Sequence, residues 1–133
     1  MTTEQNKQIS RRIAEEGFGA GNFAVLDELA APGPAAESRA TFEMIRAAFP
    51  DLQVTVEDEI AEGDKVAIRV RLAGTHQGPL AGPMGTIPPT GKHAEWHANV
   101  IQEVRDGKLV GLWPQADVLG MLQQLGVIPT QGQ

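Results

Sequence analysis

The sequence predicts an α+β fold in which helices cover one face of a curved antiparallel sheet. Residues 1–50 show the helical spacing of apolar side chains, whereas from Leu52 onward apolar and polar residues alternate as they do in strands. Helices that come before a series of hairpin-connected strands indicate separate helical and sheet layers rather than a parallel sheet. We therefore expect a four-stranded sheet, a hollow between the two layers, and a single domain over residues 1–133.

Three helices are expected before the sheet, over residues 4–17, about 22–29 and about 36–48. In the first, Ile9 and Ile13 are spaced for one apolar face. Asn22 is a candidate N-cap for the second helix. The segment 31–34, which is rich in Pro and Gly, predicts a break before the third helix, and Pro50 ends that helix.

Four strands are expected, over residues 52–57, 66–72, about 93–104 and 108–115. The long segment 74–91 is rich in Gly and Pro and predicts a loop. Asp106-Gly107 predicts a two-residue hairpin turn between the last two strands. Asp117 opens a short final helix over 118–125, and Gly126 closes it.

The predicted hairpin turn also predicts which side chains of the last two strands share a face. Arg105 should lie opposite Lys108, and side chains alternate with a period of two from there. The face with both tryptophans, expected to line the hollow, holds Trp96, Ala98, Val100, Gln102, Val104, Leu109, Gly111, Trp113, Gln115 and Asp117. A β-bulge would invert part of this assignment. On the second strand, the same alternation points Val66, Ile68, Val70 and Leu72 inward and puts His76 near the mouth.

The opposite face of the sheet is predicted to be too apolar to remain in water. It carries His97, Asn99, Ile101, Val110 and Leu112. Contiguous exposed apolar surface is typical of protein interfaces, so we expect a homodimer formed through this face.

Composition excludes several classes of function. The net charge is −6, the sequence pI is about 5.0, and no basic run is present, so neither nucleic acid nor an anionic membrane is an expected partner. With no cysteine, the chain has no disulfide or thiolate metal site. The polar segment 1–12 and the absence of a long apolar run favour a soluble cytoplasmic protein.

Several short motifs recur in an order and spacing that resemble the SnoaL-like polyketide cyclase family. They are Ala48-Phe49-Pro50-Asp51-Leu52, Ala61-Glu62-Gly63-Asp64, Gly74-Thr75-His76-Gln77-Gly78, Pro88-Pro89-Thr90-Gly91-Lys92, Asp106-Gly107-Lys108-Leu109 and the segment 113–126 with Leu122-Gln123-Gln124-Leu125-Gly126. The resemblance covers about the last two-thirds of the chain. It implies the cone-shaped NTF2-like fold.

The resemblance also implies a function. Characterised members close a ring of an aromatic polyketide by an aldol step, with no metal or organic cofactor and one aspartate as acid and base. The matching position is Asp117. A small apolar molecule is therefore the expected ligand, with Trp96 and Trp113 as walls, Gln102 or Gln115 as hydrogen-bond donors to an enolate oxygen, and His76 near the mouth.

Each of these residues also has a structural interpretation. Asp117 precedes a helix and could serve only as its N-cap, and the tryptophans could belong to the core. The chain has no Tyr and no strand between the second and third helices, in contrast to many family members. An epoxide-hydrolase-like or ketosteroid-isomerase-like enzyme, or a non-catalytic binding module of the same fold, remains an alternative.

Overall fold

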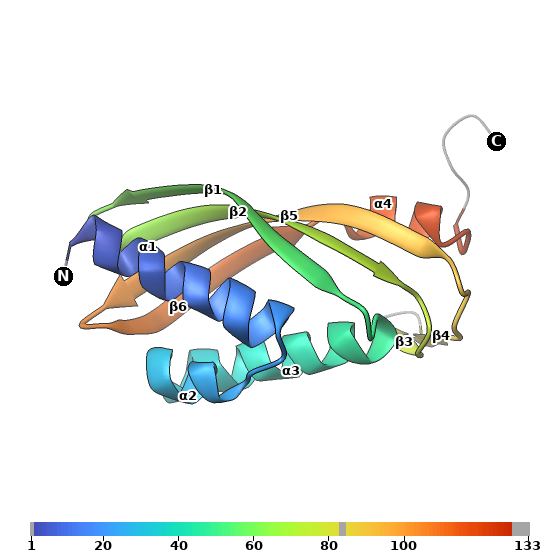
Figure 1. Ribbon diagram of the computed structural model, residues 1–133, viewed down its shortest axis with the longest axis horizontal. Helices are drawn as coiled ribbons and strands as arrows, with labels where there is room; N and C mark the ends of the chain where they lie inside the picture. Colours follow the sequence, from blue (N-terminus) through green and yellow to red (C-terminus); the bar gives the residue numbers. More distant parts are fainter. Residues whose placement is uncertain (1, 83–84, 129–133) are drawn as a thin grey trace.

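The computed structural model describes residues 2–82 and 85–128 and arranges the helices that precede the strands along one side of a curved sheet (Figure 1). The helices are α1 (Thr3–Arg12), the π-helical turn η1 (Ile13–Gly19), α2 (Ala24–Leu29), α3 (Pro32–Ala48) and α4 (Val118–Gln124). The strands are β1 (Gln53–Glu62), β2 (Lys65–Thr75), β3 (Leu80–Gly82), β4 (Gly85–Ile87), β5 (His93–Arg105) and β6 (Lys108–Ala116).

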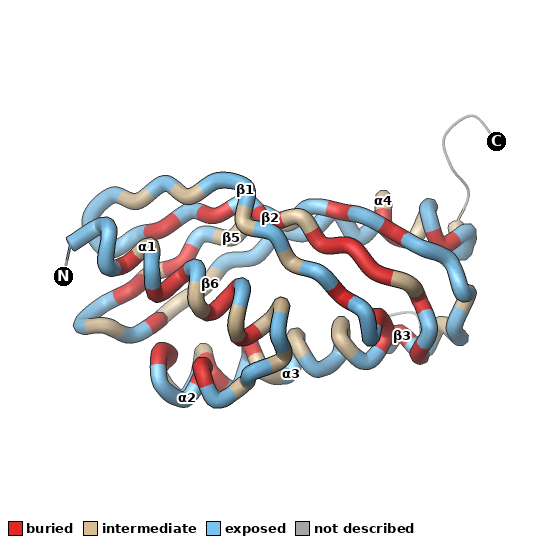
Figure 2. Tube along the Cα trace, in the orientation of Figure 1, coloured by how far each residue is buried: buried red, intermediate tan, exposed pale blue. Residues whose placement is uncertain are grey.

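The main sheet has the strand order β1-β2-β5-β6, and every neighbouring pair is antiparallel. Its helix-covered face is apolar because alternate residues of each strand point inward; on β2 these are Val66, Ile68, Val70 and Leu72, all buried. Figure 2 shows the buried positions on the strands and on the helix faces turned toward them. This is the predicted α+β architecture.

No helix in the described part of the chain is long and apolar enough to span a bilayer.

The N-terminal helices begin and end differently from the prediction. The first continues beyond Arg12 as a π-helical turn, and the second is preceded by Phe23 rather than capped by Asn22. The third begins at Pro32 instead of residue 36. Proline is compatible with a first helical turn because the N–H it lacks would have no partner inside the helix, so the segment 31–34 starts the helix instead of preceding it.

The predicted loop 74–91 contains two short strands, β3 and β4, which pair with each other. Pro83 and Met84, within the same predicted loop, lie outside the described residues. The main strands are longer than predicted; β1 runs to Glu62 with a bulge at Glu57.

The hairpin of β5 and β6 has the predicted turn but not the predicted register. Asp106 and Gly107 both have positive φ (52° and 79°), and Arg105 pairs with Lys108. Val104 then pairs with Leu109, but Glu103 pairs with Gly111, so Val110 is an extra residue without a partner on β5. From Gly111 onward the predicted face of β6 is therefore wrong: Leu112, Pro114 and Ala116 point inward, and Trp113, Gln115 and Asp117 do not.

Candidate functional site

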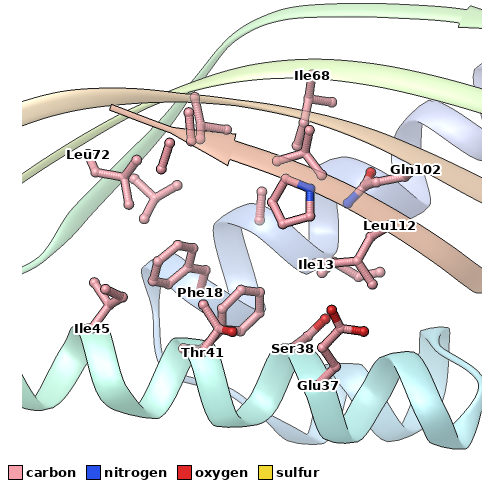
Figure 3. Close-up of a pocket in the computed structure, with 18 of the residues that line it drawn as sticks. Ile13, Phe18, Glu37, Ser38, Thr41, Ile45, Ile68, Leu72, Gln102 and Leu112 are labelled. Atoms are coloured by element: carbon pink, nitrogen blue, oxygen red, sulfur yellow. The ribbon is translucent and has the colours of Figure 1, made fainter. Parts of the chain in front are cut away.

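A cavity of about 170 Å³ lies between α3 and the inner face of the sheet (Figure 3). Its walls are almost entirely apolar. Helices contribute Ile13, Ala14, Phe18, Phe42 and Ile45, and strands contribute Val54, Ile68, Val70, Leu72, Trp96, Ala98, Val100, Leu112, Pro114 and Ala116. Such a cavity has the apolar lining of a site for a small apolar ligand.

Aromatic side chains line part of this cavity. Phe18 of η1 stacks on Phe42 of α3, with ring centroids 4.3 Å apart and planes 9° apart. Trp96 is buried and packs on Phe49, with centroids 5.0 Å apart. Trp96 therefore belongs both to the core and to the cavity wall, which reconciles its two predicted roles.

On the sheet side, the polar group at the cavity is the amide of Gln102, as predicted. Gln102 is buried, and its Oε1 accepts a hydrogen bond from the hydroxyl of Ser10, which lies on the buried face of α1. Because Ser10 occupies the amide oxygen, the two N–H donors of Nε2 are left to face the cavity (Figure 3). With the amide in this orientation, its Nε2 end is the one that a ligand would meet.

On the helix side, three polar residues that sequence reasoning missed line the cavity. They are Glu37, Ser38 and Thr41 of α3, whose side chains point toward the sheet in Figure 3. Ser38 is buried, and its hydroxyl has no hydrogen-bond partner among the described residues. A signal was available: positions 37, 41 and 45 form one helical stripe, and polar residues at its N-terminal end interrupt an apolar face.

The remaining predicted site residues of β6 lie outside this cavity. Trp113 is 54% exposed, with the Lys65 ammonium 4.8 Å from its ring centroid, and Gln115 is exposed too. Asp117 is exposed at the N-cap of α4, where its carboxylate accepts the Gly120 N–H at 2.9 Å. The expected contact of Asp117 with the hollow is wrong here because the bulge at Val110 turns this residue away.

His76 is fully buried but lies away from the cavity lining, so its predicted position near the mouth is also wrong. Its Nδ1 accepts a hydrogen bond from the Thr90 backbone N–H at 3.1 Å, and its ring packs on that of Phe49 with ring centroids 5.5 Å apart. Burial lowers the pKa of His76. Through these contacts His76, which follows β2, holds segment 88–92 against the end of that strand. Among the described residues, no three His, Asp or Glu side chains are grouped to hold a metal ion.

Comparison with known proteins agrees with this architecture. The cone-like α+β fold and its apolar interior cavity place the chain with the NTF2-like cyclase folds. A model of the SnoaL-like polyketide cyclase family matches residues 12–125, and the chain therefore belongs to that family. A search of curated proteins finds no match.

Several solved structures share the fold over nearly the whole chain. A candidate SnoaL-like polyketide cyclase from Jannaschia sp. CCS1 is 26% identical, with 96% of this chain and 95% of that chain covered and a TM-score of 0.81. IdmH, a candidate polyketide cyclase from Streptomyces antibioticus, is 31% identical over 92% of this chain and 99% of its own, with a TM-score of 0.77. AclR from Streptomyces galilaeus, described as a candidate hydroxylase, is 25% identical over 99% of this chain and 87% of its own, with a TM-score of 0.82.

Proposed function

We propose that this protein is a cofactor-independent cyclase or isomerase that abstracts a proton beside the carbonyl group of a small apolar compound. The observation that carries the proposal is the apolar cavity with the Gln102 amide fixed by Ser10. Proton removal moves an electron pair onto the carbonyl oxygen, and a fixed N–H donor stabilises the resulting enolate more than the neutral carbonyl. The enolate carbon then attacks a second carbonyl, as a cyclase requires, or is protonated elsewhere, as an isomerase requires.

The size of the cavity favours a ligand of one or two rings. An engineered cavity of about 150 Å³ holds a benzene molecule, and the cavity here measures about 170 Å³.

The identity of the acid/base group is a separate matter. The family resemblance nominates Asp117, and that role remains a prediction. In its present position the Asp117 carboxylate bonds to the backbone of α4, so a catalytic role would require this N-cap to rearrange.

Deuterium exchange at the carbon beside the carbonyl of 1-indanone, a two-ring ketone, tests the proposed function. We expect the protein to accelerate exchange in D₂O, as followed by NMR. Gln102→Leu removes the enolate donor and should slow exchange by roughly 10²–10³-fold. Gln115→Leu, a matched change on the other face of the sheet, should leave the rate unchanged.

The alternative, a non-catalytic binding module, predicts a different result in the same experiment. Such a module would bind 1-indanone, as measured by calorimetry, without accelerating exchange. Exchange that is equally fast in the Gln102→Leu variant would contradict the proposed role of the amide.

We also propose that the protein forms a homodimer through the outer face of the sheet. Ile101 and Trp113 are exposed there, by 49% and 54%, and Val110 lies on the same face. Leu112, predicted for this face, points inward instead. Trp113→Glu should convert a dimer into a monomer in light scattering at micromolar concentration; a wild-type monomer under those conditions would contradict the proposal.

A further inference from the structure

One carboxylate that the family resemblance does not nominate lies at the cavity. Glu37 is exposed, like Asp117, but it is the only titratable side chain among the described residues that line the cavity, and Figure 3 shows it directed from α3 toward the sheet. We propose that Glu37 is the proton acceptor of this site. The inference rests on the proposed function and identifies the residue that removes the proton in the first step of the proposed reaction.

The Glu37 carboxylate is not committed to another structural role. Within residues 2–82 and 85–128 it forms no ion pair and no hydrogen bond, whereas Glu43 on the same helix pairs with Arg39 at 3.9 Å. The two arginines of α3 are engaged elsewhere: Arg39 also pairs with Asp27, and Arg46 donates to the backbone carbonyls of Phe18 and Gly19. Because a cationic partner stabilises a carboxylate anion and weakens it as a base, an unpaired carboxylate is the better proton acceptor.

The neighbours of Glu37 complete a polar wall. Ser38 is adjacent, and its buried hydroxyl lacks a partner; Thr41 lies one helical turn further along the same wall. A buried hydroxyl without a partner is costly for the folded protein unless a ligand or water satisfies it. This second observation indicates that the α3 wall, as well as Gln102, is built to meet a polar part of the ligand.

Residues on the two walls perform different parts of the reaction. Glu37 on α3 takes the proton, so the C–H bond breaks and an O–H bond forms on the carboxylate. The electron pair of the C–H bond moves through the new C=C bond onto the carbonyl oxygen, which the Gln102 amide on β5 faces from the opposite wall. Glu37 then returns the proton to the product and is again a carboxylate, so no oxidant, metal or cofactor is consumed.

Ring opening of 5-nitrobenzisoxazole isolates the step that Glu37 performs. A base removes the single proton on the ring carbon next to nitrogen, the N–O bond breaks, and a coloured nitrophenolate is released. The probe has two fused rings and forms no enolate, so its rate reports proton removal by the base without a carbonyl group in the ligand. We expect the protein to accelerate this reaction beyond the same concentration of acetate.

Three variants make the test specific. Glu37→Gln should lower the rate by roughly 10²-fold or more, as expected for loss of a positioned general base. Glu43→Gln, on the same helix but outside the cavity lining, should leave the rate unchanged. Asp117→Asn is the rival variant, and under the inference it keeps at least about half of the rate. Thermal melts show whether each variant is folded.

The inference is overturned if the wild-type protein is no faster than acetate or if the folded Glu37→Gln variant retains the rate. Loss of rate in Asp117→Asn alone would overturn it in favour of the family-implied residue. Failure of the proposed function is seen separately, because the protein would then not accelerate deuterium exchange of 1-indanone, whether or not it binds the ketone. If the Glu37→Gln variant still accelerates deuterium exchange of 1-indanone, only the role of Glu37 is overturned.

Discussion

The two faces of the hairpin of β5 and β6 differ in what their side chains can do. On the inner face, Gln102 and Leu112 are paired neighbours at an apolar cavity that Glu37 approaches from the other side. On the outer face, Trp113 and Asp117 are exposed, and the Asp117 carboxylate caps a helix. One extra residue, Val110, decides which set faces the cavity. The side chains that a strand presents to the cavity therefore depend on the register of that strand.

Insertion of one alanine between Leu112 and Trp113 should give the largest effect, because it shifts the rest of β6 by one residue. Trp113, Gln115 and Asp117 would then turn inward and Pro114 and Ala116 outward, since a shift of one residue exchanges the faces of a strand. We expect a loss of more than about 3 kcal/mol of unfolding free energy, or loss of cooperative unfolding, in urea titrations.

The control for this insertion is Val110→Ala, which keeps the register and removes only an exposed side chain. It should change the unfolding free energy by less than about 0.5 kcal/mol. An insertion variant that is as stable as Val110→Ala would show that the register does not determine the faces of β6.

Ser10→Ala tests whether the Gln102 amide is held in place. The change leaves the buried Oε1 of Gln102 without its donor, so we expect a loss of about 1–3 kcal/mol of unfolding free energy. In a Gln102→Leu background the same change should cost less, because the acceptor is already absent. Equal costs in both backgrounds, measured by urea unfolding, would contradict the coupling of the two side chains.

His76 predicts a smaller effect that depends on pH. Burial lowers its pKa in the folded state, so the unfolded chain binds more protons at this residue. Its contribution to stability is therefore present above the unfolded pKa of about 6.5 and is lost as the pH falls from there toward the folded value, by at most about 1.4 kcal/mol per pH unit.

The measurement is urea unfolding at about pH 7.5 and about pH 5.5 for the wild type and for His76→Gln. The exposed His93 and His97 are present in both proteins and serve as the internal control. The variant should lose less stability between the two pH values than the wild type. An identical difference in the two proteins would show that His76 protonation does not couple to folding.

The fold was largely predictable because its signals are local. The change from helical to alternating apolar spacing near Pro50, the Asp106-Gly107 turn and the Asp117 cap all lie in short stretches of sequence, and the structure contains each of them. The family motifs also contribute to this framework: Phe49 is buried against Trp96, and Asp51 accepts the Thr75 N–H at 2.7 Å.

The site was predictable only in part because its geometry is not local. Trp96 and Gln102 precede the bulge, so their predicted inward direction is correct. A valine at position 110 gives no sign of a bulge in the sequence. The predicted inward directions of Trp113, Gln115 and Asp117, which follow it, are therefore wrong. The α3 wall was missed because Glu37, on a helix rich in polar residues, is distinguished only by what lies opposite it.

The inner-face cavity, and not the region around Asp117, should bind the small carbonyl compound. A crystal structure of the protein with 1-indanone is the most direct test. We expect the ketone between α3 and the sheet, with its carbonyl oxygen within about 3.2 Å of Gln102 Nε2 and the adjacent CH₂ group facing Glu37. A ketone bound against Trp113 and Asp117 on the outer side, with no ketone in the cavity, would contradict this expectation.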